Sequence, residues 1–512
     1  MAETGKQRGL ARPALEIGGS RMIGALVALV LGMTIAVAPH PVRAEGGGLI
    51  LMSPEQEKKI GAEQHPKILE EFGGAYDVPE IGGYVAELGG RLVAKSEMAG
   101  QAFTFTVLNS PVVNAFALPG GYVYISRGLM ALANSEAELA GVLGHEVGHV
   151  TRRHSARRYT RAVGAGILSE VARIGGAILW GDAAGQILGQ VAGMGSQLYV
   201  LKYSRDQEYE ADEVGILYID RVGNDPFAMD DFLDSMRDQS VLAAQLQGFA
   251  VDPNQVDYFS THPNTGERVR RATQNALGTG AIAGDLPARR DAYLDLIDGL
   301  LYGDDPKEGL VVDGQFVHPD LRFRFDVPDG FSVQNSPSAV RGRHESGGQF
   351  VFAGVRSNKG SSLAVINDTF RDREGGRLQQ IRATEINGID AATGVRTIRA
   401  QRGTFDEKLV VLNFGDEQYF YFMMLAPSQG NSAVKASLDG MAGSFERLSA
   451  RDARAIKPRR VDVVTVRSGD TVTSLSERMA FDDFRKDRFL VLNALDEGAV
   501  LRPGERVKLV TF

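Results

Sequence analysis

Two histidines stand four residues apart in the segment GVLGHEVGHV, which runs from Gly141 to Val150. Residues i and i+4 lie on one face of an α-helix, so the imidazoles of His145 and His149 would point the same way, one turn apart. Glu146 would lie beside this pair, about 100° around the helix axis. Two imidazoles with a carboxylate next to the first are typical of half a zinc site.

The segment around the histidines has the signals of a helix. Ser135 and Glu138 form the pattern S-x-x-E, a capping box that marks a helix N-terminus. An apolar stripe follows, made by Leu139, Val142, Leu143 and Val147. The alternative is a helix with polar residues on its solvent face. It fits less well, because the histidines flank apolar positions and not a run of charges. The zinc interpretation requires a third ligand elsewhere in the chain.

Candidates for the third ligand lie in YSRDQEYEADEVG, from Tyr203 to Gly215. Such an acidic run usually forms a solvated helix face. Glu208 and Asp212 are four residues apart and would share one face, whereas Glu210 would point elsewhere. One carboxylate can bind zinc while the other holds a ligating imidazole by its free N–H. Two histidines and one carboxylate leave a fourth position for water, as in a catalytic zinc site.

Together, H-E-x-x-H followed by E-x-x-x-D resembles the gluzincin metallopeptidases. The segments NAFALPGG, HEVGHV, SRDQEYEAD and THPNTGERVRR are similar to the family of the CAAX prenyl endopeptidase and HtpX, and most of all to its periplasmic, BepA-like branch. The resemblance covers about residues 50 to 275. By position it implies one zinc ion per chain, with His145, His149 and Glu208 as its ligands.

The same resemblance implies roles for four further residues. Glu146 would be the general base, and Asp212 would hold a zinc-ligating imidazole. His262 and Arg268, in THPNTGER, match family residues that lie near the metal. In BepA-like proteins that histidine can occupy the open zinc position and hold the enzyme in check. Either His262 or Arg268 could also stabilise the oxyanion. Glu146 would take the proton of a water that zinc acidifies, and pass it to the leaving amine.

Three segments beside these motifs bear on access to the site. NAFALPGGYVYIS, residues 114–126, predicts two strands joined by a Pro-Gly-Gly turn. It is either a plain core hairpin or an edge strand that pairs with an extended peptide. Residues 155–203 are apolar and rich in glycine but interrupted by charges, and we interpret them as a helical hairpin, either a lid or part of the core. His154, in RRHSARR, is interpreted as part of a basic surface patch.

The composition is that of an ordinary globular chain. It has 512 residues, of which 43% are hydrophobic and 23% charged, and this length predicts about three domains. The formal net charge of −8 argues against binding to nucleic acid. The absence of cysteine excludes cysteine-ligated metals, disulfides and lipidated cysteines.

The first 44 residues are interpreted as a signal peptide. Basic residues precede an uncharged apolar run from Met22 to Ala38, and Val42 and Ala44 occupy the small-residue positions of a cleavage site. The alternative is an uncleaved transmembrane anchor, for which a run of 17 residues is at the lower limit of length. Export without cysteines is compatible with a bacterial periplasm, because an oxidising compartment does not require disulfides.

The predicted fold class is α+β in three parts. Residues 45–303 are expected to form a mainly helical zincin-type metallopeptidase domain with a small edge sheet. Residues 309–450 contain the strand-like segments LRFRFDV, GQFVFAGV, LVVLNFG and QYFYFMML, and we expect an antiparallel α+β domain of unknown role. Residues 461–512 resemble a LysM module, a βααβ fold that binds peptidoglycan glycans. The charged insert FDDFRKDR departs from the usual LysM pattern.

These features predict a zinc-dependent endopeptidase of the cell envelope that hydrolyses misfolded or stalled envelope and outer-membrane proteins. The expected partners are such unfolded proteins, peptidoglycan through the LysM-like module, and the membrane or the outer-membrane assembly machinery, with no nucleic acid. Two alternatives stay open. One is a wall-tethered, protease-like chaperone or scaffold that cleaves little, and the other is a membrane-integral, HtpX-like protease. The complete ligand set weighs against an inactive enzyme, because a degenerate site usually loses a ligand or the base.

Overall fold

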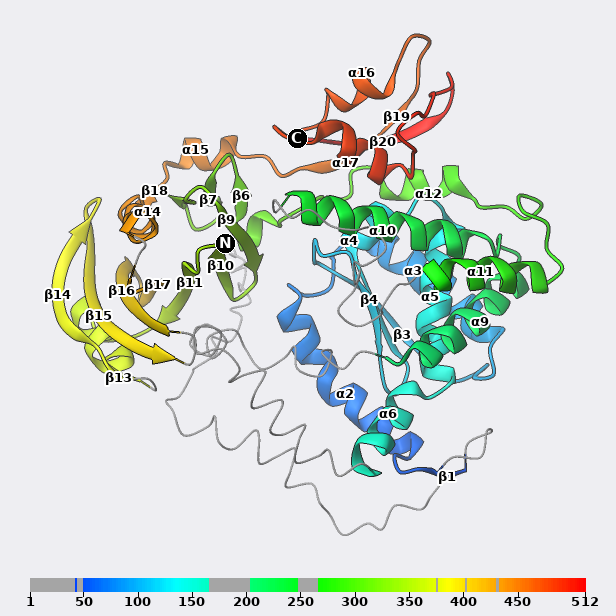
Figure 1. The fold of residues 1–512 in the computed structure, drawn as a ribbon, viewed down its shortest axis with the longest axis horizontal. Helices are drawn as coiled ribbons and strands as arrows, with labels where there is room; N and C mark the ends of the chain where they lie inside the picture. The colour runs from blue at the N-terminus through cyan, green and yellow to red at the C-terminus, as the bar shows by residue number, and fades with distance from the viewer. Residues whose placement is uncertain are drawn as a thin grey trace, which may run out of the picture.

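The computed structural model describes residues 42–43, 49–164, 203–246, 266–373, 376–400, 403–429 and 432–512. These residues form a mixed α+β structure, with a mainly helical part and a mainly β part joined by the chain around residue 305 (Figure 1). The apolar run Met22–Ala38, most of the predicted helical hairpin and His262 lie outside the described residues. No helix within the described ranges combines the length and the apolar character that a membrane span requires.

The helical part contains one small sheet. Its helices are α2 (Pro54–Glu71), α3 (Pro79–Ala94), α4 (Arg127–Leu132), α5 (Glu136–Thr151), α6 (His154–Gly164), α9 (Arg205–Arg221), α10 (Ala228–Leu246), α11 (Gly266–Gly278) and α12 (Arg290–Ile297). The sheet contains β3 (Thr104–Leu108), β5 (Tyr122–Ser126) and β4 (Ala115–Leu118), in this spatial order. A separate pair joins β1 (Val42–Arg43) to β2 (Leu49–Ile50). Within the described ranges strand β4 pairs with β5 only, so it is an edge strand there, and an edge strand can pair with a further chain.

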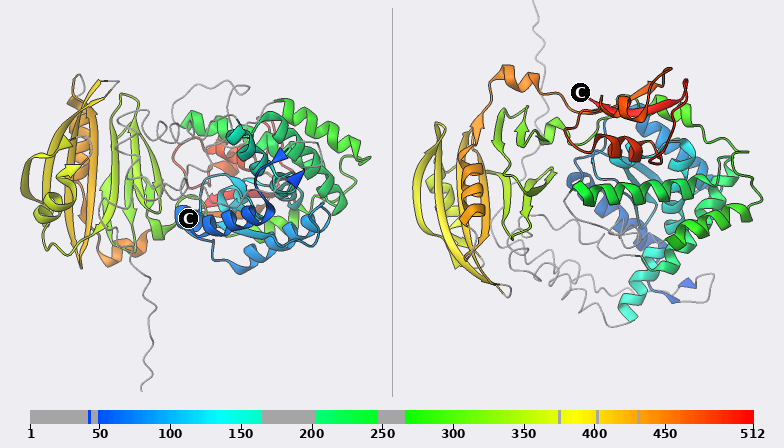
Figure 2. Two further views of the ribbon diagram at one scale, coloured as in Figure 1. Left: turned by 90° about the horizontal axis from the view of Figure 1, so that it is seen from below. Right: turned by 45° about the horizontal axis from the view of Figure 1, so that its top comes forward.

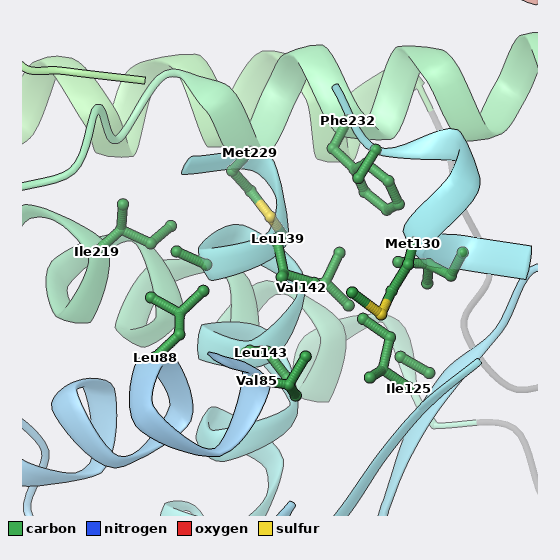
Figure 3. Close-up of a cluster of buried hydrophobic side chains, with 14 of the residues drawn as sticks. Val85, Leu88, Ile125, Met130, Leu139, Val142, Leu143, Ile219, Met229 and Phe232 are labelled. Atoms are coloured by element: carbon green, nitrogen blue, oxygen red, sulfur yellow. The ribbon is translucent and has the colours of Figure 1, made fainter. Parts of the chain in front are cut away.

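The two motif helices pack backbone against backbone. Helix α5 is buried from Glu136 to His149, and its apolar side chains pack against α3, α9 and α10 (Figure 3). A Cβ atom on Gly144 would lie 3.0 Å from the carbonyl oxygen of Gly215, and one on Gly148 would lie 3.0 Å from that of Ala211. Any larger residue at these positions would push the two helices apart, so the glycines let the HExxH and ExxxD segments meet at close range.

A buried carboxylate anchors the N-terminus of α5 to its neighbours. Glu136 accepts hydrogen bonds from the guanidinium groups of Arg91 and Arg289, at 2.7 and 2.6 Å, from the Tyr84 hydroxyl and from the Asn224 amide. Burial alone would raise the pKa of Glu136, but these hydrogen bonds outweigh it and lower the pKa to about 2. Two of the donors precede α5 in the sequence and two follow it. Glu136 therefore holds the first turn of α5 in place against both segments.

We expect Glu136→Gln to destabilise the protein by on the order of 2 kcal/mol at pH 7. The folded-state pKa of Glu136 lies below the ordinary 4.5. Its contribution is therefore complete above pH 4.5 and is lost as the pH falls towards 2. Urea unfolding of both proteins at pH 7 and at pH 3 checks this, with the exposed Glu87→Gln on α3 as the control. A difference in unfolding free energy that is the same at both pH values contradicts the assignment.

The β part is built around two antiparallel sheets, and a third, two-stranded one pairs β12 (Asp372–Arg373) with β13 (Gly376–Arg377). The larger has the order β14 (Gln379–Ile386), β15 (Ile389–Ala400), β16 (Gly403–Gly415), β17 (Gln418–Pro427), β11 (Gln349–Arg356), β10 (Ala339–His344) and β9 (Phe331–Ser336). The smaller has the order β18 (Glu446–Arg447), β8 (Phe323–Asp326), β7 (Gln315–His318) and β6 (Leu310–Val312). The remaining short elements are η2 (Pro306–Glu308), α13 (Ser362–Val365) and η3 (Ile366–Phe370). The four strand-like segments of the sequence are β8, β11, β16 and β17, so their prediction is confirmed.

Both faces of the larger sheet are covered. One face packs against the smaller sheet and α14 (Ser432–Gly443) over a cluster rich in phenylalanine, which includes Phe323, Phe352 and Phe422. The other face packs against α13 and η3. Figure 2 shows α14, in orange, on the face of the larger sheet that also carries the smaller sheet. No described residue of this β part belongs to the histidine and carboxylate cluster of the helical part.

The C-terminal residues pack on the helical part. After α15 (Ala450–Ala455), the order is β19 (Arg460–Thr465), α16 (Val472–Ser476), α17 (Arg485–Leu492) and β20 (Arg506–Thr511), with β19 and β20 antiparallel. Val461 joins the core around α5, and the chain lies against α10 and α12 (Figures 1 and 2). The buried Lys508 ammonium donates to the carbonyls of Ala131, Leu132 and Ala133, at 2.8, 2.9 and 2.8 Å. These carbonyls, at the end of α4, are acceptors that the helix itself leaves unpaired, whereas burial lowers the pKa of Lys508 well below its usual range.

Candidate metal centre

Helix α5 carries His145, Glu146 and His149. The predicted cap is half confirmed: the Ser135 hydroxyl accepts a hydrogen bond from the backbone N–H of Glu138 at 3.1 Å. The Glu138 carboxylate does not complete the box, because it accepts from the backbone N–H of Asn134 at 2.9 Å. The helix start is nevertheless where the sequence predicts it.

Helix α9 supplies the carboxylates. It begins with a full capping box between Ser204 and Gln207, which starts the helix just before Glu208. Glu208 and Asp212 are both buried and both face α5, as their spacing predicts. Glu210 lies on another side of α9 and contacts Arg157 at 2.8 Å.

Three donor atoms converge between the two helices. The Nε2 atoms of His145 and His149 are 2.9 Å apart, and each is 3.5 Å from one carboxylate oxygen of Glu208. All three side chains are buried, and among the described residues they form the one group of histidine and carboxylate side chains whose ligand atoms lie within 4.8 Å of one another. The cluster can hold a metal ion.

The donor set fits zinc. Nitrogen and oxygen ligands lie about 2.0–2.1 Å from zinc, so the ligand atoms of a tetrahedral site are about 3.3 Å apart. The two Nε2 atoms are 2.9 Å apart, and each lies 3.5 Å from a different oxygen of Glu208, so these distances are close to that value. Two imidazoles and a carboxylate leave one of four positions for water or substrate.

The outer side of His145 is held by Asp212, whose carboxylate lies 2.7 Å from Nδ1. Arg268, from α11, contacts Asp212 through Nε at 2.8 Å and Nη2 at 2.7 Å, and Glu208 through Nη1 at 2.9 Å. Burial alone would raise the pKa of Asp212, but the charges of Arg268 and His145 lower it well below its usual range. The structure therefore places the Arg268 guanidinium on both carboxylates, and its charge favours the ionised form of Asp212.

Glu146 is buried in the same helical turn as His145, with 2% of its surface exposed. Burial alone would lower the pKa of Arg268, but the carboxylates of Asp212, Glu208 and Glu146 together raise it. Glu146 is thus close enough to the Arg268 charge to interact with it. A buried carboxylate that follows the first converging histidine in the chain is compatible with the predicted role of general base.

His154 is not part of a surface patch, and that interpretation is wrong. Its side chain is fully buried, and its Nδ1 lies 2.7 Å from Nδ1 of His149. The helical repeat of α5 does not extend to His154, because α5 ends at Thr151 and Arg153 has a left-handed φ of 52°. This turn brings His154, the first residue of α6, back onto His149. Burial lowers the pKa of His154 to about 4.

A pocket opens beside His149. It is lined by Ala117 and Leu118 of the edge strand β4, by the turn residues Gly120 and Gly121, and by Tyr203 among others. Both glycines have a left-handed φ, of 85° and 88°, so the turn depends on them. The Tyr203 ring stacks on the His149 ring with centroids 3.9 Å apart. The edge strand thus borders the pocket that leads to the donor cluster.

A helix with H-E-x-x-H packed on a helix with E-x-x-x-D is the arrangement of a gluzincin-type metallopeptidase site. In agreement with this, residues 81–276 match Peptidase family M48. The chain is 36% identical to the beta-barrel assembly-enhancing protease of Yersinia pestis over 167 residues, which are 32% of this chain and 34% of that protein.

Two other relatives match over longer stretches. The mitochondrial metalloendopeptidase OMA1 of Schizosaccharomyces pombe is 28% identical over 226 residues, 43% of this chain and 61% of that protein. A protease HtpX homolog of Pyrococcus abyssi is 27% identical over 295 residues, 52% of this chain and 94% of that protein. The chain spans about a third of the length of the assembly-enhancing proteases that it matches.

Proposed function

We propose that this protein is a zinc-dependent endopeptidase of the cell envelope that degrades misfolded or stalled envelope and outer-membrane proteins. The convergence of His145, His149 and Glu208 beside the buried Glu146 carries the proposal. The match to Peptidase family M48 and the similarity to beta-barrel assembly-enhancing proteases support it.

The chemistry follows from the residues that surround the donors. Zinc, when bound, supplies a Lewis acid that lowers the pKa of a water and polarises the scissile carbonyl. Glu146 takes the proton of the attacking water and transfers it to the leaving amine. Asp212 keeps His145 in one orientation, and Arg268 forms ion pairs with Asp212 and Glu208. In this proposal Arg268 acts through the carboxylates.

The pocket beside the edge strand is the reason for proposing a preference for unfolded chains. An extended peptide that pairs with β4 would run beside His149, and its backbone hydrogen bonds would place it without regard to sequence. A folded protein has few extended segments with free backbone groups, whereas a stalled or misfolded one exposes many. We therefore propose that the enzyme selects substrates by their extended, unfolded conformation and not by their sequence. Such selection is what a protease of protein quality control requires.

Location and domain roles are parts of the same proposal. We propose a cleavable signal peptide, residues 1–44, export to the periplasm, and a division into a peptidase domain (45–303), an α+β domain (309–450) and a LysM-like module (461–512).

Sequencing of the mature N-terminus should give a start near Glu45, and a membrane-bound chain that retains Met22–Ala38 would favour the anchored alternative. Co-sedimentation with purified peptidoglycan tests glycan binding by the module.

His262 is proposed to control the resting enzyme by occupying the open metal position. We expect His262→Ala to cleave casein several-fold faster than the wild type, because an imidazole there would exclude the water that Glu146 must activate. The measurement is the initial rate of cleavage, with the zinc content of the same sample. Slower cleavage at unchanged zinc content would assign His262 to the oxyanion, and an unchanged rate would leave it without a role in the site.

The metal proposal is tested by elemental analysis of the purified protein. We expect about one zinc per chain, as three protein ligands and one open position imply. Removal of the metal with a chelator should abolish casein cleavage, and added zinc should restore it. Cleavage that survives complete metal removal contradicts the proposal.

A further inference from the structure

A third histidine lies behind the second proposed zinc ligand. His154 and His149 are both buried, and their Nδ1 atoms are 2.7 Å apart. The Nε2 atom of His154 lies 3.2 Å from the Glu210 carboxylate, to which Arg157 also donates at 2.8 Å. A connected row of polar groups thus runs from His149 outward to the surface.

The protons of this row can be assigned from the donor and acceptor inventory. Nε2 of His149 faces Glu208 and Nε2 of His145, where a metal needs its lone pair, so its proton must be on Nδ1. Two N–H groups cannot face each other at 2.7 Å, so Nδ1 of His154 must accept. His154 then carries its proton on Nε2, where Glu210 accepts it. Every atom of the row has a complementary partner in this one arrangement.

The arrangement parallels the one behind the first ligand. His145 donates from Nδ1 to Asp212, and Arg268 holds that carboxylate. His149 donates instead to the neutral imidazole of His154. The carboxylate of this second row, Glu210, contacts His154 and not His149, and its side chain is 34% exposed. The reason is electrostatic, since a further carboxylate in direct contact with His149 would add unbalanced negative charge to a buried site.

We propose that His154 is a positioning residue of the metal centre, which fixes the tautomer and ring orientation of His149 through a neutral imidazole supported by Glu210. The local fold holds His154 for this task. The Arg153 side chain donates to Glu57 at 2.9 Å and to the carbonyl of Met52 at 2.7 Å, which secures the left-handed turn. The Gln207 amide, on the ligand helix α9, donates to the carbonyl of His154 at 3.1 Å.

The inference rests on the proposed zinc site, and zinc affinity of the full chain tests it. His154→Phe keeps a ring but removes the acceptor, whereas His154→Asn restores an acceptor near the position of Nδ1. We expect zinc, in competition with a chelator, to bind the Phe variant about 10–100-fold more weakly than the wild type. The Asn variant should recover most of this loss, and His318→Phe, which removes a buried histidine of the β part, should have no effect.

Three outcomes overturn the inference. Equal zinc affinity of the wild type and the Phe variant removes any role for His154. Equal losses in the Phe and Asn variants assign it to packing alone. If the Phe variant does not fold, His154→Gln takes its place in the comparison. The glutamine amide reaches the position of Nε2 but not that of Nδ1, so this variant also lacks the acceptor for His149. In that comparison, equal affinities for the Gln and Asn variants overturn the inference. A wild type that binds no zinc would instead contradict the proposed function.

Discussion

Glu146→Gln is expected to retain zinc and to lose peptide cleavage by about 10²–10⁴-fold, the usual contribution of a general acid–base residue. The amide has the shape of the carboxylate but cannot accept the proton of the attacking water. Glu146 is not one of the three converging donors, so the metal should stay. The measurement is the turnover of a labelled casein, with the zinc content of the same preparation.

The control for this variant is Glu213→Gln. Glu213 is an exposed carboxylate on the motif helix α9, outside the donor cluster. Its turnover and zinc content should equal those of the wild type. Full activity in Glu146→Gln would exclude the proposed mechanism, and loss of zinc in that variant would mean that Glu146 holds the metal.

Glu208→Ala is expected to lose the metal, and with it all cleavage. Removal of Glu208 leaves two imidazoles, which are too few protein ligands for a catalytic zinc site. Elemental analysis after gel filtration should find less than about a tenth of the wild-type zinc, a loss larger than that for a supporting residue.

Glu210→Ala is the matched comparison, because it removes a carboxylate two residues away on the same helix. Glu210 contacts His154 and Arg157 and is not in the donor cluster. This variant should keep about one zinc per chain after gel filtration. Its affinity for zinc should be lower than that of the wild type, because Glu210 supports the His154 imidazole that orients His149. If Glu210→Ala loses the metal and Glu208→Ala retains it, Glu210 is the ligand. The argument that the i, i+4 spacing places Glu208 on the metal side of α9 would then be wrong.

The sequence predicted the local features that depend on short spacing. The two strands expected in residues 114–126 are confirmed as β4 and β5, and the start of α5 at Ser135 is where the sequence predicts it. The spacing of Glu208 and Asp212 placed both on one face, and the structure brings that face to the histidines. The roles of these residues in binding metal and in catalysis stay predictions.

The features that the sequence did not predict depend on backbone breaks and long-range packing. His154 was misplaced because its basic neighbours in RRHSARR indicated an exposed segment, whereas the left-handed turn at Arg153 brings it back onto His149. The anchoring of α5 by Glu136 joins residues far apart in the chain, which no periodicity indicates. The sequence around Lys508 is that of an ordinary strand. The burial of Lys508 against α4 depends on contacts between residues far apart in the chain, so it could not be predicted from the local pattern.

The most direct test of the proposed function is the mapping of new peptide termini. An unfolded outer-membrane β-barrel protein is incubated with the zinc-loaded full chain or with Glu146→Gln, and the fragments are sequenced by mass spectrometry. We predict new internal termini at many sites with the wild type and none with the variant. If the zinc-loaded wild type binds the unfolded protein but produces no new termini, the chain is a protease-like chaperone and the proposed activity is wrong.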